Sequence, residues 1–245
     1  MNTQTPTPPP WFEGLPKDER GFYVLAEAGW VDGQPMFSKF DMDRTIALAM
    51  HRACALCGYP MPKGHNVYRG FSQGDAAEIR MNQREHSHDL AGPLHLSCAL
   101  YSAIVCPFLR EKTARMGKDS KINPGGKRGS LAAVMGFSDF GLMVLQVPNP
   151  DPEALPPNFM TAYLGLQDDI RYRDGQELLE RYYAAVESDR EIIDMSQPRM
   201  FWGPTDADYR KRKLAIKRIG EVTRRTPVGI PMIVDSPVPY ITFPL

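Results

Sequence analysis

Four residues of this chain are paired in the way that metal ligands are paired. Two residues separate Cys54 from Cys57, and two separate His95 from Cys98. Zinc takes thiolates and neutral imidazoles in a tetrahedron, and this spacing lets one tight turn, or one turn of helix, direct both side chains of a pair at a single ion. A sharp turn at Gly58 would let backbone amides face the thiolates, as in a zinc knuckle. We therefore predict one zinc ion per chain, bound by these four residues.

The number of ligands predicts the role of this zinc. Four protein ligands complete the tetrahedron, whereas a catalytic zinc keeps an open position. A redox-active CxxC of the thioredoxin kind is a rival interpretation, but that motif begins a helix in a βαβ unit, and none surrounds Cys54. Cys106 lies eight residues after Cys98, about 80° around an ideal helix, so we expect it to be buried and free of metal. A structural zinc is the expectation.

Two histidines between the ligand pairs raise an alternative, catalytic function. His86 and His88 occupy the place where His-Me finger (HNH-like) nucleases have a general-base histidine. Such a nuclease also needs a second metal-binding side chain on the following helix, and residues 95–106 offer none beyond the zinc ligands. A nuclease that uses His88 is therefore the alternative to a non-catalytic protein. His51 and His65 lack a partner at ligand spacing, which predicts surface or core roles.

A zinc deaminase is a third possibility, and the order of the motifs argues against it. In such an enzyme an HxE element precedes a PCxxC, whereas here the CxxC comes first and no proline precedes Cys54.

Composition limits the class of protein. The chain has 245 residues, of which 42% are hydrophobic, enough for one large domain or two small ones with a real core. Its formal net charge is zero, which excludes a polyanionic or polycationic molecule but not one charged face. No run approaches the roughly 18 apolar residues of a membrane span, and residues 1–10 lack the features of a secretory signal. We expect a cytoplasmic protein, in which cysteines bind metal rather than form disulfides.

Basic residues in two segments are candidates for contacts with nucleic acid or with an acidic protein. Residues 110–130 end in a glycine-rich basic loop without a GxxxxGK[ST] arrangement, and residues 206–225 form an amphipathic pattern with a basic face. A solvated linker and an ordinary surface helix are the simpler interpretations. The partner is therefore an unknown protein or nucleic acid. The candidate contact residues are Lys118, Lys121, Lys127, Arg128, Arg210, Lys213 and Lys217.

The elements that must position the zinc ligands follow from local patterns. Asp-Gly within residues 21–40 predicts a β-hairpin, and Asp41 or Asp43 can cap a short helix that leads to the first ligand pair. Between the pairs, residues 67–71 and 77–81 predict a second hairpin. Residues 95–106 predict a helix, which ends before a proline. Knuckle, hairpin and helix in this order are typical of a treble clef.

The expected fold class is α+β, with a treble-clef-like zinc unit embedded in a mixed α/β domain and a helical C-terminal part. One or two buried strands are predicted over residues 131–147 and another over residues 163–172. Asp174 opens a capped helix, whose inner face carries Leu178, Leu179, Tyr182 and Val186.

The predicted organisation has five parts. They are a disordered proline-rich tail (1–13), the zinc-binding domain (14–110), a basic linker or loop (111–130), an α+β extension packed on the zinc unit (131–197), and a basic amphipathic helix with an extended C-terminal tail (198–245).

Six segments of the chain are distinctive as a set: GLPKDERGFYV (14–24), WVDGQPMF (30–37), CALCGYPM (54–61), PLHLSCALYSAIVCPFL (93–109), INPG (122–125) and DGQELLERYYAAVES (174–188). Together they resemble an uncharacterised zinc-binding family of actinobacteria and their phages. Members carry a CxxCGxxL knuckle and a PxHxxCAxYxxxxCPFL helix. The separation of the two ligand pairs, 37 residues here, is longer than usual for the family, so residues 62–89 are where this chain differs. The resemblance implies zinc at the four predicted ligands and brings no established activity.

Overall fold

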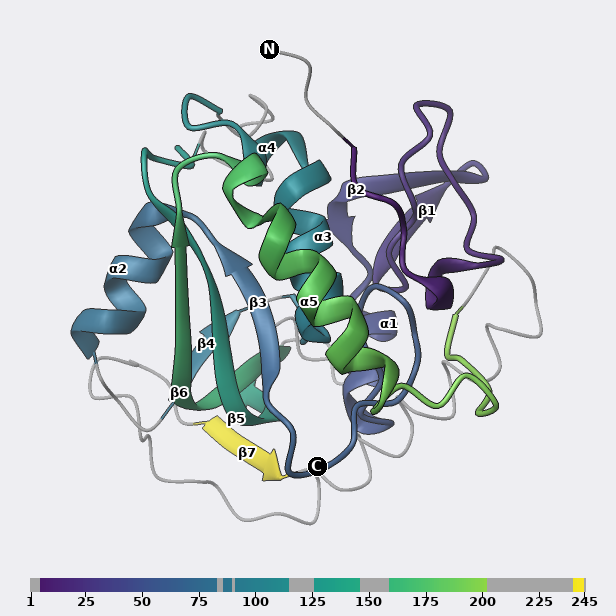
Figure 1. Cartoon of the computed structure of the whole chain (residues 1–245). Helices are drawn as coiled ribbons and strands as arrows, with labels where there is room; N and C mark the ends of the chain where they lie inside the picture. The colour runs from purple at the N-terminus through teal and green to yellow at the C-terminus, as the bar shows by residue number, and fades with distance from the viewer. Residues whose placement is uncertain are drawn as a thin grey trace.

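The computed structural model describes residues 5–82, 86–89, 91–114, 126–145, 159–201 and 240–244. Over these residues the chain is a mixed α+β protein, as the sequence predicted. A five-stranded antiparallel sheet is its centre, with helices on both sides and a small two-stranded ribbon beside it (Figure 1). No helix in the described part is long and apolar enough to cross a membrane.

The strands of the large sheet come from distant parts of the chain. Along the sheet the order is β3-β5-β6-β4, and β7 pairs with the far half of β5, beyond β3. Figure 1 shows α2 on one side of this sheet, with α3 and α5 on the other. The strands are β3 (Val67–Phe71), β4 (His86–Asp89), β5 (Ala132–Leu145), β6 (Phe159–Tyr172) and β7 (Tyr240–Pro244).

Strands β5 and β6 form the long hairpin on which the sheet is built. Both predicted strands are confirmed, and residues 131–147 contribute one strand rather than two. Consecutive residues Ala132 to Met135 of β5 are fully buried, because helices cover both faces of the sheet at this point. The register shifts between Gly136 and Phe137, which marks a β-bulge.

The first predicted hairpin and the helix after it are confirmed. Strands β1 (Ala28–Val31) and β2 (Gln34–Phe40) are joined by Asp32 and Gly33, both at positive φ (49° and 76°). Such a pair is typical of the type I′ turn that matches the twist of a hairpin. Helix α1 (Met42–Met50) begins at Asp41, whose carboxylate accepts a hydrogen bond from the Arg44 backbone N–H at 3.2 Å.

The second predicted hairpin is wrong. Strand β3 pairs with β5, and residues 77–81 belong to helix α2 (Gln73–Asn82). Ser72 and Asp75 decide this, because the serine hydroxyl accepts from the Asp75 N–H at 3.3 Å and donates to the Asp75 carboxylate at 2.6 Å. This Ser-x-x-Asp pair is a capping box variant, so helix α2 replaces the second strand.

The predicted disordered tail is also corrected, for residues 5–13. Trp11 and Phe12 form the short 3-10 helix η1 (Pro10–Phe12), and both side chains are 1% exposed. The Tyr182 hydroxyl donates to the Thr7 carbonyl at 2.6 Å, and the Phe12 ring packs edge-on against Tyr101. Two large aromatic side chains bury enough apolar surface to order this proline-rich segment.

The remaining helices complete one continuous core. They are α3 (Leu96–Val105), α4 (Pro107–Arg110), η2 (Gly175–Leu178) and α5 (Leu179–Arg190). Asp174 caps η2 as predicted, accepting from the Gln176 N–H at 2.9 Å. The main cluster of buried apolar residues contains side chains from Trp11 to Ile193. The predicted boundary near residue 131 therefore divides neither the sheet nor the core. The predicted helix over residues 206–225 lies outside the described residues.

Candidate metal centre

The four predicted ligands meet at one buried point. Their candidate ligand atoms all lie within 4.8 Å of one another, and the exposed fraction is 0% for Cys54, Cys57 and Cys98 and 3% for His95. The distance from Cys57 Sγ to His95 Nδ1 is 3.5 Å. A tetrahedral zinc ion with Zn–S bonds of about 2.3 Å holds its sulfur ligands roughly 3.8 Å apart, so the cluster could hold such an ion. Among the described residues no other cluster of potential ligands is found.

The first ligand pair lies on a tight turn between α1 and β3. The Gly58 N–H donates to the Cys54 carbonyl and the Cys54 N–H donates to the Tyr59 carbonyl, both at 2.9 Å. Gly58 has φ +75°. This left-handed conformation is unfavourable for any residue with a β-carbon, so glycine suits the position. The predicted turn at Gly58 is confirmed. We call residues 54–58 the knuckle, and its two cysteines both reach the cluster.

The second ligand pair lies at the start of α3. His95 is the N-cap residue, with an extended backbone and no side-chain capping bond, and Cys98 is in the first turn. Asp189 of α5 supplies the missing cap, accepting from the Ser97 N–H at 2.7 Å and from the Ser97 hydroxyl at 2.5 Å. His95 is therefore free to act as a ligand, because another helix satisfies the start of α3.

The orientation of the His95 ring identifies its ligand atom. Nδ1 faces Cys57, and Nε2 lies 3.1 Å from the Pro60 carbonyl oxygen. A carbonyl can only accept, so Nε2 carries a proton and donates to it, which leaves Nδ1 as the ligand atom that faces the cluster. A hydrogen bond from the second nitrogen is the usual way in which a protein fixes a metal-binding histidine.

Burial and mutual charge shift the pKa values of the four groups in opposite directions. Burial opposes ionisation of Cys54, but hydrogen bonds from Cys57 and Cys98 and the charge of His95 outweigh it, so the pKa of Cys54 lies well below its usual value. Burial raises the pKa of Cys98 well above its usual value and also raises the pKa of Cys57. Burial lowers the pKa of His95, but the charges of Cys54 and Cys57 have a larger, opposite effect. The pKa of His95 therefore lies well above its ordinary value. The cluster thus favours a thiolate beside an imidazolium, whose protons a divalent cation would displace.

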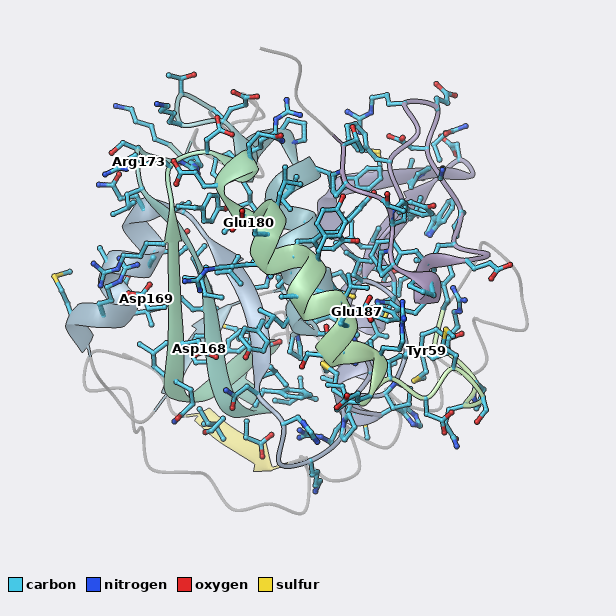
Figure 2. All side chains as sticks on the ribbon, viewed as in Figure 1. Tyr59, Asp168, Asp169, Arg173, Glu180 and Glu187 are labelled. Carbon is cyan, nitrogen blue, oxygen red and sulfur yellow. The ribbon has the colours of Figure 1, made fainter. Side chains whose placement is uncertain are left out.

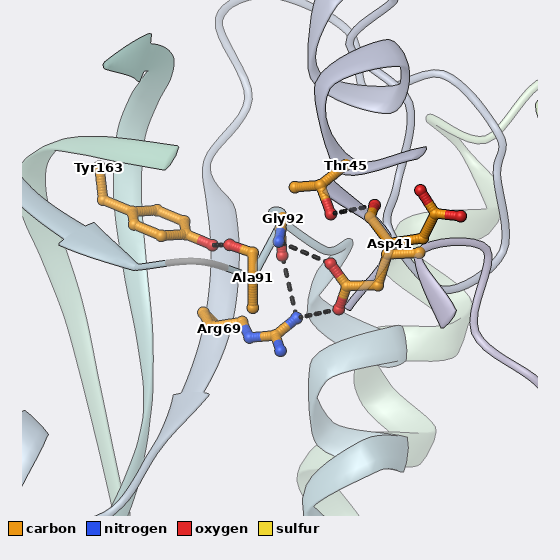
Figure 3. A network of polar contacts seen from close by, with 7 residues as sticks. Asp41, Thr45, Arg69, Ala91, Gly92 and Tyr163 are labelled. Carbon is orange, nitrogen blue, oxygen red and sulfur yellow. Dashed lines mark hydrogen bonds and ion pairs between the residues drawn. The ribbon is translucent and has the colours of Figure 1, made fainter. Parts of the chain in front are cut away.

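A buried ion pair joins the knuckle to the segment that carries His95. The Glu27 carboxylate is fully buried and accepts from Arg69 at 3.0 Å and from the Gly92 N–H at 2.7 Å. Arg69 also donates to the Gly92 carbonyl at 3.0 Å, and Figure 3 shows the Arg69 side chain beside Gly92. The Ala55 carbonyl of the knuckle accepts from the Glu27 N–H at 3.1 Å.

A second contact fixes the same segment from the sheet. The Tyr163 hydroxyl of β6 donates to the Ala91 carbonyl at 2.9 Å, as Figure 3 shows. The Ala55 N–H donates to the Pro93 carbonyl at 2.9 Å. The two ligand pairs are therefore held together by protein contacts as well as by the ligands themselves.

The sequence identified the ligands but not the residues that support them. Glu27, Asp189 and Pro60 act through tertiary contacts at separations of 65, 92 and 35 residues. A lone acidic residue in an apolar segment was the one available signal for Glu27, because a buried carboxylate requires a charged or hydrogen-bonding partner.

Arg128 is corrected as a candidate contact residue. Its side chain is fully buried, and its guanidinium donates to the carbonyls of Leu109 at 3.0 Å and Arg173 at 2.9 Å. It also lies 4.9 Å from the centre of the Tyr172 ring. Arg128 therefore joins α4 to the end of β6 and is not available to a partner.

The other candidate residues are divided between the surface and the undescribed segments. Lys127 is exposed, as are His51 and His65. Cys106 is outside the metal cluster, as expected, but it is only partly buried, at the C-cap of α3. Residues 86–89 form β4, at one edge of the sheet, and the side chains of His86 and His88 are outside the described set, as are Lys118, Lys121, Arg210, Lys213 and Lys217.

Two groups of charged side chains on the sheet and helices form ion pairs. Asp169 on β6 accepts from Arg80 of α2 at 2.7 Å and from Arg171 at 2.7 Å. On α5, Arg190 pairs with Glu187 at 3.2 Å. Figure 2 shows Glu187 on α5 and Asp169 on β6, in separate regions of the molecule.

Comparison with protein-family models, with curated proteins and with solved structures finds no match for this chain.

Proposed function

We propose that this protein is a zinc-stabilised binding protein in which the metal has a structural role. The observation that carries the proposal is the closed donor set: three thiols and one imidazole, all buried, with the second histidine nitrogen already bonded to a carbonyl. Such a set leaves no coordination position for water or substrate. Zinc is the metal whose preferred ligands and tetrahedral geometry these residues match.

The proposed zinc unit is treble-clef-like in how its ligands are supplied. A knuckle gives the first pair and the first turn of α3 gives the second, as in that architecture. Between them, strand β3, helix α2 and strand β4 take the place of the usual hairpin. In this proposal the metal holds the knuckle against the helix, and the sheet carries the rest of the unit.

The partner in this proposal is a protein or a nucleic acid, with the protein ranked slightly first. The pairing of Asp169 with Arg80 and Arg171 reduces the free positive charge that phosphates would need, and the burial of Arg128 removes one candidate contact. Of the residues predicted to contact phosphate, Lys127 is the described one that is exposed. A protein partner requires no such excess of positive charge.

The nuclease alternative has less support. A His-Me finger places its histidine on a hairpin, whereas β4 pairs with β6 of the later hairpin. Helix α3 would have to supply a second metal ligand, and its buried positions beyond Cys98 are Ala99, Leu100, Tyr101, Ala103 and Ile104.

Elemental analysis of the purified protein tests the metal site. The expected result is about one zinc per chain, lost in Cys54→Ser. Removal of the zinc should clearly lower the melting temperature, because ligation supplies folding free energy. A protein without zinc, or a Cys54→Ser variant with its full metal content, contradicts the metal site.

A gel-shift series tests the class of partner. Phosphate contacts should give weak, sequence-independent binding that salt strongly reduces, and Lys213→Glu with Lys217→Glu should weaken it. No shift of the wild type at about 50 mM salt would remove the nucleic-acid partner.

A plasmid and a divalent metal in the same assay test the nuclease. Cleavage that disappears in His88→Ala would replace the binding function with a catalytic one.

A further inference from the structure

The chain that follows α5 returns to the metal knuckle and packs on it. The Met200 N–H donates to the Gly58 carbonyl at 2.7 Å. A β-carbon on Gly58 would lie only 2.2 Å from the Met200 carbonyl oxygen, so the two backbones touch without an intervening side chain. We call residues 199–201 the strap. Its contact with Gly58 is made one residue after the ligand Cys57.

Arg199 attaches the strap at two further points. Its guanidinium donates to the Glu13 carbonyl at 2.6 Å and to the Tyr59 hydroxyl at 3.3 Å. It also lies 4.9 Å from the centre of the Tyr59 ring, a cation–π distance. In Figure 2 Tyr59 lies beside the chain that follows α5. The contacts of Arg199 therefore depend on the position of Tyr59, the residue that follows Gly58 in the chain.

The apolar side chains of the strap pack on a small buried cluster. Met200 and Phe201 pack against Ala26, Ala47, Leu48 and Ala53, a group separate from the main core. Ala53 immediately precedes the ligand Cys54, and the Ala26 N–H donates to the Leu56 carbonyl of the knuckle at 3.1 Å. The surface that receives the strap therefore combines helix α1 with residues that adjoin or bond to the knuckle, and Phe201 also packs against the main core.

From these contacts we propose that metal occupancy of the Cys3His cluster controls whether the strap is docked. Backbone hydrogen bonds from Ala26, Glu27 and Ala55 hold the middle of the knuckle without the ion, and the ion would add the bonds that join its two cysteines to His95 and Cys98. Without the ion, Gly58 and Tyr59, which follow the second cysteine, are held less firmly where Met200 and Arg199 need them. The strap then leaves the knuckle while the large sheet persists, because the aromatic group Phe71, Phe137 and Tyr163 contains no metal ligand.

Docking and metal binding are then reciprocally coupled. If the metal favours the docked strap, the docked strap must raise metal affinity by the same factor. The strap also leads to the C-terminal part of the chain, which returns to the body at β7 on β5. This inference rests on the proposed metal site.

Limited trypsin digestion of the full chain, followed by mass spectrometry, tests the coupling. Cleavage after Arg199 should be slow in zinc-loaded protein and about tenfold faster after chelation, as expected when local opening exposes a site. Cleavage after the buried Arg128 is the internal reference for global unfolding and should stay slow. Equal acceleration at both sites, or none at Arg199 in protein shown to be metal-free, would overturn the proposal.

The reciprocal experiment measures zinc affinity by equilibrium competition with a chromogenic chelator. Arg199→Ala should bind zinc at least about threefold more weakly than the wild type, because it weakens the docked strap. Arg190→Ala is the matched control, since this arginine pairs with Glu187 at the surface of α5, and its zinc affinity should not change. An unchanged affinity in Arg199→Ala overturns the coupling alone, whereas a purified wild type without zinc overturns the proposed metal site as well.

Discussion

Arg52 shows how a single residue can hold an unfavourable backbone conformation next to the metal site. It follows α1 with φ +48°, in the left-handed region that usually belongs to glycine. The Ala53 N–H donates to the Leu48 carbonyl at 2.8 Å and the Arg52 N–H to the Ala49 carbonyl at 2.9 Å, the hydrogen bonds of a Schellman motif. The helix thus ends correctly without a glycine.

The Arg52 side chain offsets the cost of that conformation. Its guanidinium donates to the Asp139 carboxylate at 2.7 Å and lies 4.7 Å from the centre of the Phe140 ring. These contacts connect the end of α1 to β5. Arginine is therefore unfavourable for the backbone conformation at this position, but its side chain stabilises the packing of the helix on the sheet.

Two substitutions at Arg52 separate these contributions. Arg52→Ala loses the side-chain contacts and keeps the left-handed backbone, whereas Arg52→Gly loses the same contacts and removes the backbone cost. We expect Arg52→Ala to lower the free energy of unfolding by about 2 kcal/mol, and Arg52→Gly to lower it by about 1 kcal/mol less. Urea unfolding of zinc-loaded protein measures both. A glycine variant less stable than the alanine variant, as in a helix interior, would contradict this account.

At the scale of elements, the start of α3 depends on α5. Asp189 is 4% exposed and binds both the backbone N–H and the hydroxyl of Ser97, in the first turn of the helix that carries His95 and Cys98. A carboxylate near a helix N-terminus also interacts favourably with the helix dipole. Helix α5 therefore positions the second ligand pair.

Removal of this cap has a predictable cost. Asp189→Ala leaves the buried Ser97 N–H without its partner and should lower the free energy of unfolding by about 2 kcal/mol. Ser97→Ala removes only the hydroxyl bond and should cost about 1 kcal/mol. Chemical denaturation of the two variants at the same zinc concentration makes the comparison. Equal costs would mean that the backbone bond contributes nothing.

The ion pair between Arg80 of α2 and Asp169 of β6 should make the stability of the protein depend on pH. Burial alone would raise the pKa of Asp169, but hydrogen bonds from Arg80 and Arg171 outweigh it and lower the pKa below its usual value. A lowered pKa in the folded state stabilises the protein above the unfolded-state pKa of about 3.9, and this stabilisation is lost as the pH falls through the folded-state pKa.

Asp169→Asn tests this sign. The variant should be about 1 kcal/mol less stable than the wild type at pH 7. The difference should begin to shrink below about pH 4, where the carboxylate of the unfolded chain takes up a proton, and it should be lost once the pH falls below the lowered folded-state pKa. Glu187→Gln, in the exposed pair with Arg190, is the control and should change stability little at either pH. A difference for Asp169→Asn that grows in acid would contradict the assignment.

The comparison of sequence and structure shows which elements local patterns can predict. Asp32-Gly33 and Asp41 act within a few residues, so the first hairpin and α1 were predicted from the sequence. The strand partner of β3 lies more than sixty residues away in β5, and no local pattern specifies it. Ser72-x-x-Asp75 was a local signal for α2, and it was missed because the apolar residues that follow also fit a short strand.

The same reasoning applies to the metal site. Two ligand pairs at ligand spacing identify the site because its chemistry requires those residue types at that separation. Its supporting residues Glu27 and Asp189 were not predictable, because each reaches the site only through the folding of the whole chain.

At the scale of the whole molecule, the zinc-binding part (14–110) and the α+β extension (131–197) share one core. The N-terminal segment contributes Trp11 and Phe12, α3 contributes Tyr101, and α5 contributes Tyr182 to the same cluster. Phe12 lies 5.0 Å from Tyr101, and Tyr101 lies 5.9 Å from Tyr182, between ring centres. Because this aromatic contact joins distant parts of the chain, we expect unfolding to be a single cooperative transition.

Substitution at the N-terminal segment tests this unity directly. Phe12→Ala should lower the free energy of unfolding by about 3 to 5 kcal/mol, the cost of removing a large buried aromatic side chain, and should keep one transition. A disordered tail, by contrast, would tolerate the change without loss. Met195→Ala is the matched control, because this side chain is 51% exposed and should contribute little. Calorimetry of the zinc-loaded proteins measures both the stability and the number of transitions. An unchanged melting temperature for Phe12→Ala would mean that residues 5–13 are a disordered tail. A second transition would mean that the core consists of two units that unfold separately.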